Sequence, residues 1–198
     1  MLASMSRSLL IPMSYPLDCL GVLACEGLDW QVFGGQTTLM TYSIRPFSSD
    51  DADWLIRQHA DHYAKAEGFD DTFGPLVASI IQDFLGGHDP KVEAGWVAHD
   101  GDMRLGSIFC VRNGDQTAKL RLFYLVPEAR GTGAAQALLD RCLTFARTAG
   151  YRDMTLWTHE SHVAAGKIYA RNGFVRVSAK PVHSFGVDLV EETWQISF

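Results

Sequence analysis

The sequence of 198 residues lacks several features that would assign it to a class of protein. It has only four cysteines, Cys19, Cys25, Cys110 and Cys142, and no C-x-x-C pair, so a disulfide framework is not indicated. It has no cluster of lysine or arginine, and its net charge is −6, which argues against binding to nucleic acid. We therefore expect reduced thiols, a cytoplasmic location and no nucleic-acid partner.

A run of about 18 apolar residues, the length that crosses a bilayer, is also missing. The first forty residues contain an arginine and an apolar stretch, but Pro12, Pro16 and Asp18 interrupt it. No membrane partner is expected. Three interpretations of residues 1–40 stay open: an export signal, a loosely ordered N-terminal arm, or residues added by an upstream start codon. Met40 directly precedes the first predicted strand.

From Thr41 onward, strand and helix signals alternate regularly. The predicted elements are a strand at 41–47, helices at 52–68 and 72–87, three strands between 95 and 126, a helix at about 133–149, a strand at 154–159, a helix at about 162–172, and strands around 174–180 and 189–197. Asp100-Gly101 and Asn113-Gly114 are hairpin signals between the middle strands. This order implies an α/β fold with a sheet of mixed direction, in which residues 119–159 make a right-handed parallel crossover.

The segment PEARGTGAAQALLD, residues 127–140, places an arginine and two glycines directly before an apolar helical run. Gly131 and Gly133 leave backbone N–H groups exposed at a helix start, where the helix dipole favours an anion. A Walker A loop needs a lysine that is missing here, and a Rossmann fingerprint needs a third glycine where Gln136 stands. A plain strand–helix turn explains the glycines but not the arginine and the preceding Val126-Pro127 as well.

The spacing Arg130-x-x-Gly133-x-Ala135 matches the pattern R/Q-x-x-G-x-G/A. The segment therefore resembles the acyl-CoA pyrophosphate turn of the GCN5-related N-acetyltransferases (GNAT). The resemblance covers about residues 41–198, because LRLFYLVPEARGTG is similar to the family's central strand and turn. TLWTHESHVAAGKIYARNGF is similar to its next strand and helix, with the pattern A-x-x-x-Y-x-x-x-G-F at Ala165, Tyr169, Gly173 and Phe174.

The C-terminal segment PVHSFGVDLVEETWQISF resembles the tail of a narrower group, whose acetyltransferase domain often follows a MarR-type winged helix. That group often carries a histidine where Val182 stands. Residues 1–40, with two prolines, are too short for a winged helix. We therefore expect a stand-alone acetyltransferase domain at 41–198, preceded by an extension at 1–40 that is poorly ordered or a start-site artefact.

The resemblance implies a fold and a reaction. The fold is a mixed, mostly antiparallel central sheet with one parallel, splayed strand pair, flanked by about four helices: the acyl-CoA N-acyltransferase fold. The reaction is transfer of an acetyl group from acetyl-CoA to a primary amine of a small molecule or peptide, by direct attack and without a metal. The alternative is a non-catalytic acyl-CoA-binding sensor or interaction module. A homodimer is compatible with either.

The resemblance also implies how acetyl-CoA is held. The strand backbone directly before the turn would pair with the pantetheine arm, and the turn would bind the pyrophosphate, with the Thr132 hydroxyl as an added donor. The cofactor-binding residues predicted in this way are Tyr124, Leu125, Val126, Arg130, Gly131, Thr132, Gly133, Ala134 and Ala135.

Three residues are candidates for proton transfer. Tyr169 stands where the family places a tyrosine that protonates the departing thiolate, although a tyrosine that only packs its ring is the alternative. Glu160 lies at the carboxyl end of a predicted strand, where α/β sites commonly open. His183 is of a residue type that titrates near neutrality. Either of the last two is a candidate base.

The first predicted helix carries His59, His62 and Tyr63, where the family usually contacts its acceptor. His162 stands where many members have an asparagine that binds pantetheine, which puts that contact in doubt. The pairs His59/His62 and His159/His162 have the i, i+3 spacing of some metal ligands. Because no cysteine or carboxylate pattern accompanies them, no metal site is predicted.

Overall fold

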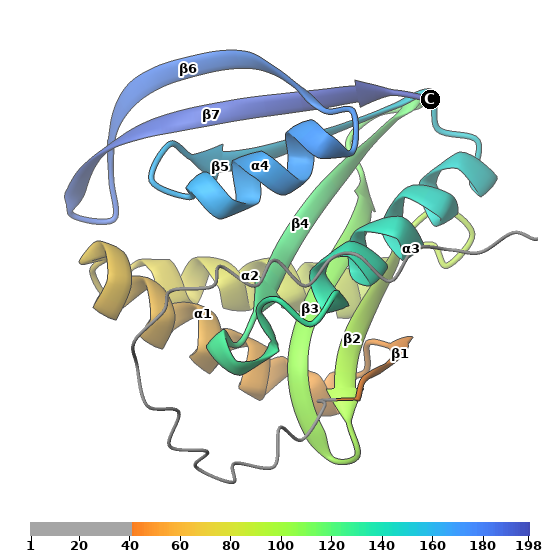
Figure 1. The fold of residues 1–198 in the computed structure, drawn as a ribbon, viewed down its shortest axis with the longest axis horizontal. Helices are drawn as coiled ribbons and strands as arrows, with labels where there is room; N and C mark the ends of the chain where they lie inside the picture. The colour runs from red at the N-terminus through yellow and green to blue at the C-terminus, as the bar shows by residue number, and fades with distance from the viewer. Residues whose placement is uncertain (1–40) are drawn as a thin grey trace, which may run out of the picture. The chain divides into compact units, whose positions relative to one another are not determined.

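The computed structural model describes residues 41–198, and the predictions for residues 1–40 lie outside the described residues. Its strands and helices (Figure 1) are β1 (Ser43–Pro46), α1 (Ala52–Glu67), α2 (Phe73–Gly87), β2 (Ala94–Asp100), β3 (Met103–Arg112), β4 (Thr117–Leu125), α3 (Ala134–Thr148), β5 (Asp153–His159), α4 (Val163–Arg171), β6 (Val175–Ser184) and β7 (Val187–Ser197). The order of elements predicted from the sequence is confirmed.

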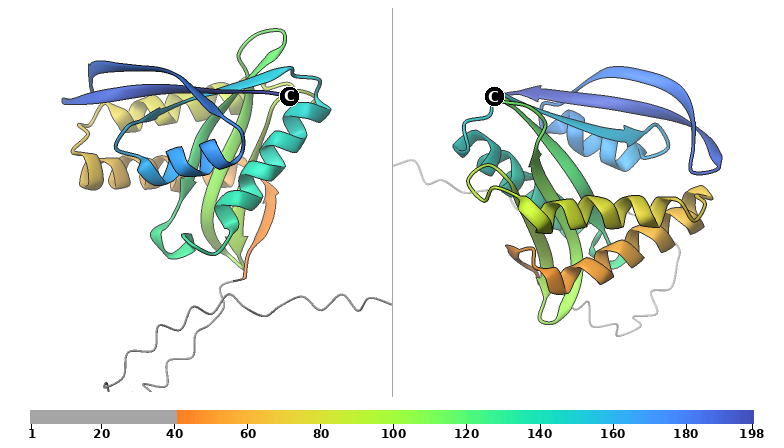
Figure 2. Two further views of the ribbon diagram at one scale, coloured as in Figure 1. Left: turned by 45° about the horizontal axis from the view of Figure 1, so that its top comes forward. Right: turned by 180° about the vertical axis from the view of Figure 1, so that it is seen from behind.

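The strands form one seven-stranded sheet in the order β1-β2-β3-β4-β5-β7-β6. All neighbours are antiparallel except β4 and β5, which are parallel. Helices α1 and α2 cover one face of the sheet, and α3 and α4 lie on the other (Figures 1 and 2). The predicted mixed, mostly antiparallel sheet with one parallel pair and four helices is therefore confirmed.

Each face of the sheet has its own apolar core. On the α1–α2 face, Leu55, Ile81 and Phe84 pack with Phe109 of β3. On the α3–α4 face, the buried residues of α3 pack with strand residues; those of α3 are Ala134, Leu138, Leu139, Cys142, Leu143 and Ala146. Helices α1, α2 and α3 therefore each bury one stripe against the sheet, although Leu76 and Leu85 of α2 are exposed.

The start of α1 is fixed by a buried carboxylate. Asp51 is fully buried and accepts hydrogen bonds from the Arg45 guanidinium at 2.7 Å and from Arg104 Nε at 2.6 Å. Burial alone would raise the pKa of Asp51, but the two arginines and the Ser48 backbone N–H hold it well below its usual range. These bonds tie β1 and β3 to the start of α1. Several predicted site residues lie further along this helix.

The last two strands differ from the prediction. β6 continues to Ser184 and pairs with β7 along its length, and the turn between them is the two residues Phe185 and Gly186, with φ of 54° and 76°. Two positive φ values match the twist of a tight hairpin, so the strand does not end at residue 180 as predicted. Pro181 is tolerated because β6 is the edge strand of the sheet.

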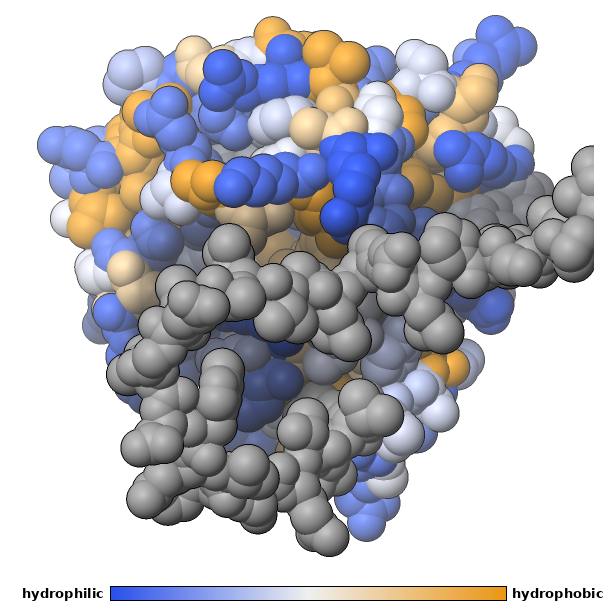
Figure 3. Space-filling view, viewed as in Figure 1, coloured by the Kyte–Doolittle hydropathy of each residue, from blue (hydrophilic) through white to orange (hydrophobic). Residues whose placement is uncertain are grey.

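The surface over this hairpin is mixed in character. On the face seen in Figure 3, hydrophilic residues cover much of the α4 and β6–β7 region, with hydrophobic residues scattered among them. Val175 and Val177 of β6 are exposed.

Among residues 41–198, no helix is long and apolar enough to cross a membrane. Cys110 and Cys142 are buried free thiols, as expected, whereas Cys19 and Cys25 lie outside the described residues.

Candidate active site

The parallel strands β4 and β5 pair only at their beginnings. Thr117 to Lys119 pair with Asp153 to Thr155, but β4 then runs on to Leu125 and β5 to His159 with no further pairing between them. The two strands diverge beyond this point (Figure 1). The predicted splayed pair is therefore present, and it leaves backbone groups on the β5 side of β4 without a strand partner.

A bulge bends β4 inside this open region. Tyr124 pairs with Ser107 and Arg121 with Phe109, so β4 holds one more residue than β3 between these pairs. Leu122, within the bulge, has a left-handed φ of 48°, and the buried Ser107 hydroxyl donates to its carbonyl at 2.7 Å. Bulges of this kind bend a strand and redirect its side chains beside functional sites.

The backbone predicted to pair with pantetheine is partly engaged already. The Val126 N–H donates to the Leu105 carbonyl at 2.9 Å, so it is not available toward the open side of β4. Tyr124 and Leu125 remain paired with β3. A Cβ on Gly106 would lie 2.5 Å from the Tyr124 carbonyl oxygen, so only glycine permits this close approach of the two strands.

The predicted phosphate turn is built as its glycines require. Gly131 and Gly133 have φ of 79° and 90°, a region that side chains with a Cβ rarely adopt. Within residues 41–198, no acceptor lies in hydrogen-bond reach of the backbone N–H groups of Gly131, Thr132, Gly133, Ala135 and Gln136. Helix α3 begins directly after Gly133, so Ala135 and Gln136 belong to its first turn. The turn therefore presents free donors and a helix N-terminus to an anion.

Two side chains at the turn, Thr132 and Tyr42, have contacts that the sequence does not predict. The Thr132 hydroxyl donates to the Ala129 carbonyl at 2.8 Å and accepts weakly from the Ala134 N–H, so it closes the turn from within. Tyr42, which the sequence analysis did not select, borders the turn: a Cβ on Gly133 would lie 3.4 Å from its hydroxyl. The sequence gives no signal for this, because Tyr42 belongs to the segment that enters β1.

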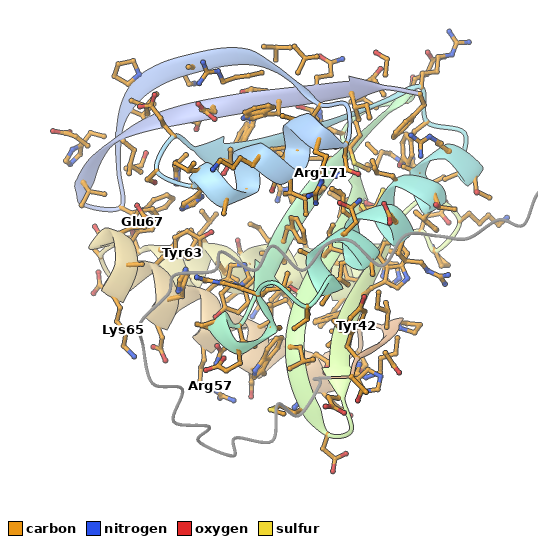
Figure 4. All side chains as sticks on the ribbon, viewed as in Figure 1. Tyr42, Arg57, Tyr63, Lys65, Glu67 and Arg171 are labelled. Carbon is orange, nitrogen blue, oxygen red and sulfur yellow. The ribbon has the colours of Figure 1, made fainter. Side chains whose placement is uncertain are left out.

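A polar contact joins the start of α3 to the end of α4. The Gln136 side-chain amide donates to Asn172 Oδ1 at 2.7 Å and accepts from the Arg171 guanidinium at 2.9 Å. Arg171 lies at the end of α4 that faces α3 (Figure 4). Gln136, which breaks the Rossmann pattern, thus helps to hold α4 and its Tyr169 against the phosphate turn.

Tyr169 lies between the two halves of the split sheet. Its ring centroid is 6.1 Å from that of Phe123 on β4 and 6.3 Å from that of Trp194 on β7. The side chain is buried, and burial, together with nearby Tyr63, raises its pKa well above its usual range. The hydroxyl has no hydrogen-bond partner among residues 41–198 and keeps its proton at neutral pH.

The three residues predicted on α1 differ in exposure. His59 is buried, and its Nδ1 donates to the Leu55 carbonyl at 3.0 Å; burial lowers its pKa to about 4. His62 is half-buried and lines a hollow of about 470 Å³ with Tyr124 and Pro127. Tyr63 packs its ring 5.4 Å from that of His162, and burial raises its pKa to about 12. His62 and Tyr63 therefore border the open region, whereas His59 supports it from the core.

Glu67 and His162 form a pair that the sequence analysis missed. His162 Nε2 lies 3.5 Å from Glu67 Oε1, and Thr158 Oγ1 lies 3.1 Å from His162 Nδ1. Burial, and then nearby His159, lowers the pKa of His162, so the ring is neutral at pH 7. Glu67 and Tyr63 lie on the side of α1 that faces α4, and Lys65 lies on the other (Figure 4). A carboxylate thus borders the opening beside Tyr63.

Aromatic rings close this side of the opening. Phe69 and Phe73, after α1, pack against Tyr63 and against Phe185 of the β6–β7 turn, with ring centroids between 4.8 and 5.3 Å apart. His159 packs on Phe69, and its buried Nδ1 has no hydrogen-bond partner among the described residues. Three regions distant in the sequence, residues 63–73, His159 and Phe185, therefore form one wall.

The comparisons with known proteins agree with this geometry. Residues 91–176 match the family model of the acetyltransferase (GNAT) domain. An uncharacterized N-acetyltransferase of Mycobacterium bovis is 33% identical over 86 residues, which are 43% of this chain and 54% of that protein. The matched segment thus spans about half the length of this relative. Both findings support a GNAT acetyltransferase domain in this chain.

Solved structures show the same fold. A GNAT acetyltransferase from Staphylococcus aureus has a TM-score of 0.66 and 17% identity, and the match covers 79% of this chain and 99% of that one. YncA from Salmonella typhimurium, solved with its cofactor acetyl-CoA, has a TM-score of 0.61 and 19% identity over 80% and 94% of the two chains. The acyl-CoA N-acyltransferase fold implied by the resemblance is confirmed.

Glu160 and His183, the two candidate bases, are both exposed. Glu160 is exposed in the turn after β5. His183 lies on the exposed β6–β7 hairpin, where its Nδ1 is 2.8 Å from Asp188 Oδ1 on the same hairpin. Within residues 41–198, neither side chain is hydrogen-bonded or ion-paired to Tyr169, His159 or His162. In residues 41–198, no three histidine, cysteine or carboxylate side chains are grouped to hold a metal ion.

Proposed function

We propose that this chain is an N-acetyltransferase of the GNAT family that transfers the acetyl group of acetyl-CoA to a primary amine. The observation that carries the proposal is the conjunction of three features at one opening. These are the N–H groups of the phosphate turn, the β5 side of β4 and the Tyr169 hydroxyl, all of which lack a partner within residues 41–198. Each matches a different part of a thioester substrate: pyrophosphate, pantetheine and sulfur.

The residues present fit acetyl-CoA on physical grounds. The turn offers unpaired backbone donors at the N-terminus of α3, where a pyrophosphate gains both hydrogen bonds and the favourable end of the helix dipole. Arg130 is exposed beside them and adds a positive charge. The backbone of Tyr124 and Leu125 would pair with the amides of pantetheine. Val126 would offer only its carbonyl, because its N–H already donates to Leu105. Acetyl-CoA, when bound, contributes the thioester that is cleaved.

Tyr169 would act as the general acid. The amine nitrogen forms a bond to the acetyl carbon, the carbon–sulfur bond breaks, and the leaving sulfur needs a proton. A neutral hydroxyl at the split of the sheet is a suitable donor, and the raised pKa of Tyr169 keeps it protonated. Its ring is fixed by Phe123, Phe174 and Trp194, so the hydroxyl is held in one place.

Glu67, rather than Glu160 or His183, would face the incoming amine. Its carboxylate borders the opening, and His162 orients it through the contact at 3.5 Å. A carboxylate there attracts an ammonium group and accepts the proton that the amine loses on attack. His162 itself is a positioning residue, because Thr158 occupies its Nδ1 and Glu67 its Nε2. The exposed positions of Glu160 and His183 give them no such contact.

The first experiment is thiol release from acetyl-CoA with a panel of amines: an amino acid, a polyamine, an aminoglycoside and a peptide with a free N-terminus. Acetyl-CoA binding is measured in parallel by thermal shift. Release that depends on one class of amine supports the proposal and identifies the acceptor. Binding without release from any amine would favour the non-catalytic sensor, and absence of binding would contradict both functions.

The role of Glu67 is tested by comparing Glu67→Gln with Glu160→Gln, using the best amine of the panel. We expect Glu67→Gln to lower kcat/KM for the amine by about 10- to 100-fold and to leave acetyl-CoA affinity unchanged, because a general base contributes about that much or more. Glu160→Gln should behave as wild type. The reverse result would restore Glu160 as the base and remove Glu67 from the mechanism.

Five finer points belong to the proposal. The acceptor would be a small molecule or a peptide, and the reaction would need no metal. We also propose that this domain is related to the MarR-linked group, because its tail from Pro181 onward, PVHSFG, resembles the tail of that group. The cytoplasmic location rests on the reduced cysteines. A homodimer, compatible with the exposed edge strand β6, is tested by light scattering of the purified protein.

A further inference from the structure

A second hollow lies on the α1–α2 face of the sheet. It has a volume of about 230 Å³ and is bordered by the C-terminal half of α2, by β3 and by the beginning of β4. Figure 2 (right) shows α2 crossing this face of the sheet. The hollow shares no lining residue with the larger one beside α1, and no step of the proposed acetyl transfer uses it.

Two cations of β4 point into this hollow. Lys119 and Arg121 are two residues apart and thus on the same face of the strand, and both line it. Lys119 is only 7% exposed, and its Nζ lies 3.4 Å from the ring centroid of Trp157. Arg121 is half-buried. Within residues 41–198, neither side chain has a carboxylate within 4 Å, although Asp83 borders the same hollow.

Two like charges held close together in a partly dry site oppose each other. Burial lowers the pKa of Lys119 to about 8, and the neighbouring Arg121 contributes to this. Burial also lowers the pKa of Arg121. The nearby carboxylate of Glu93 is occupied, because its two oxygens accept from the backbone N–H groups of Asp89 and Arg112. The carboxylates of Glu191 and Asp83 offset the two charges only in part, because the pKa values of Lys119 and Arg121 are still lowered. An anion from solution would give both cations a direct partner.

The rest of the lining indicates the kind of anion. Ile80 and Phe84 of α2, and Val111, which pairs with Lys119 on the neighbouring strand, add apolar surface to the hollow. Its volume is below the 300 to 1,000 Å³ that is typical of pockets for drug-sized ligands. We propose that this hollow binds a small organic carboxylate, with its carboxylate on Arg121 and Lys119 and its apolar body against Ile80, Phe84 and Val111. This site is independent of the acetyl-transfer proposal.

Calorimetric titration with benzoate, its neutral isostere benzamide and inorganic phosphate tests the proposal. We expect benzoate to bind the wild-type protein and benzamide to bind at least tenfold more weakly, because only benzoate carries the charge. Equal binding of benzoate and benzamide would show that the cations play no part. Binding of phosphate without benzoate, or of none of the three, would overturn the proposal as well.

Two variants locate the site. Arg121→Gln and Lys119→Met should each weaken benzoate binding by about tenfold or more, because each removes a charge-assisted hydrogen bond. Lys167→Gln, an exposed change on α4, is the matched control and should bind benzoate as wild type does. A cooperative thermal unfolding transition in each variant shows that the domain is folded. Benzoate affinity that is unaffected by both β4 changes would place the ligand elsewhere and contradict the proposal.

Discussion

The phosphate turn and the side-chain cluster around Glu67 border the same opening but are made of different parts. The turn is formed by consecutive residues. Its donors are backbone N–H groups, which are exposed because Gly131 and Gly133 adopt positive φ values. The cluster is formed by side chains from α1, the loop after it, β5 and α4, and most of its contacts join residues far apart in the sequence.

This difference decides what each part does and how it responds to change. A backbone site tolerates changes of side chain but not of conformation, because its donors are identical in every residue except proline. A side-chain site depends on the identity and protonation of each member. Cofactor binding is therefore expected to be insensitive to pH, whereas the acceptor side, with its four histidines of lowered pKa, is expected to respond.

The largest effect is expected at Tyr169. Tyr169→Phe keeps the ring and its packing but removes the proton for the leaving sulfur, so kcat should fall by about 10²- to 10⁴-fold while acetyl-CoA affinity changes little. The loss should be similar for every accepted amine. Thiol release under saturating substrate measures it.

Tyr151→Phe is the control for this change. Tyr151 is equally buried, but its hydroxyl donates to the Val92 carbonyl, away from the opening. Full kcat in Tyr169→Phe would make Tyr169 a structural residue and leave water to protonate the sulfur. A loss of the same size in Tyr151→Phe would mean that the rate reports on packing and not on the proton.

Gly133→Val addresses the turn. The φ of 90° strains any residue with a Cβ, and the new side chain would meet the Tyr42 hydroxyl, so the N–H groups should move out of position. Acetyl-CoA affinity should fall by about 10- to 100-fold, the equivalent of one or two charge-assisted hydrogen bonds. Isothermal titration gives the dissociation constant.

Gly150→Val separates strain from ligand contact. Gly150 has a similar φ of 87° at the end of α3, with open space around it. Both variants should lose stability, but only Gly133→Val should lose affinity. Unchanged affinity in a folded Gly133→Val protein would refute the turn as the pyrophosphate site.

The free energy of unfolding should depend on pH through the buried histidines. His59 has a pKa of about 4 in the folded chain and about 6.5 when unfolded, so the unfolded state binds its proton first as the pH falls. The stability that neutral His59 supports is complete above pH 6.5 and is lost below it, by about 2 kcal/mol at pH 5. Urea unfolding at pH 7 and pH 5 measures the change.

His59→Phe should make stability less dependent on pH over this range, and Lys167→Gln, an exposed change that removes no histidine, should leave the dependence unchanged. Acetyl-CoA affinity of the folded wild-type protein should vary little between the two pH values. A wild-type stability that is flat from pH 7 to 5 would contradict the burial of His59.

The smallest effect is expected from removing residues 1–39. The segment has no regular amphipathic pattern, and the family resemblance begins near Thr41. A protein that starts at Met40 should fold with a similar midpoint and bind acetyl-CoA with similar affinity, as measured by thermal shift and titration. Aggregation or lost binding would show that the segment takes part in the core or in a dimer contact.

Much of the fold and one part of the site were accessible from sequence. Short-range patterns decided the order of helices and strands, because hydrophobic period and turn residues act within one element. The predicted β6 is too short, because Pro181 and His183 are typical of a loop. These residues belong to the strand only because they pair with β7. The bulge at Leu122 had no sequence signal, because it depends on register against β3.

Local sequence was enough to predict the conformation of the turn at 130–133, because Gly131 and Gly133 are near neighbours and their positive φ values are a local property. The tertiary structure alone decided which side chains meet at the opening. It placed Glu67 beside His162, brought Tyr42 to the turn, and left Glu160 and His183 exposed on the surface. Burial and distance fix the charge and reach of these groups, and both arise only when separate elements pack together.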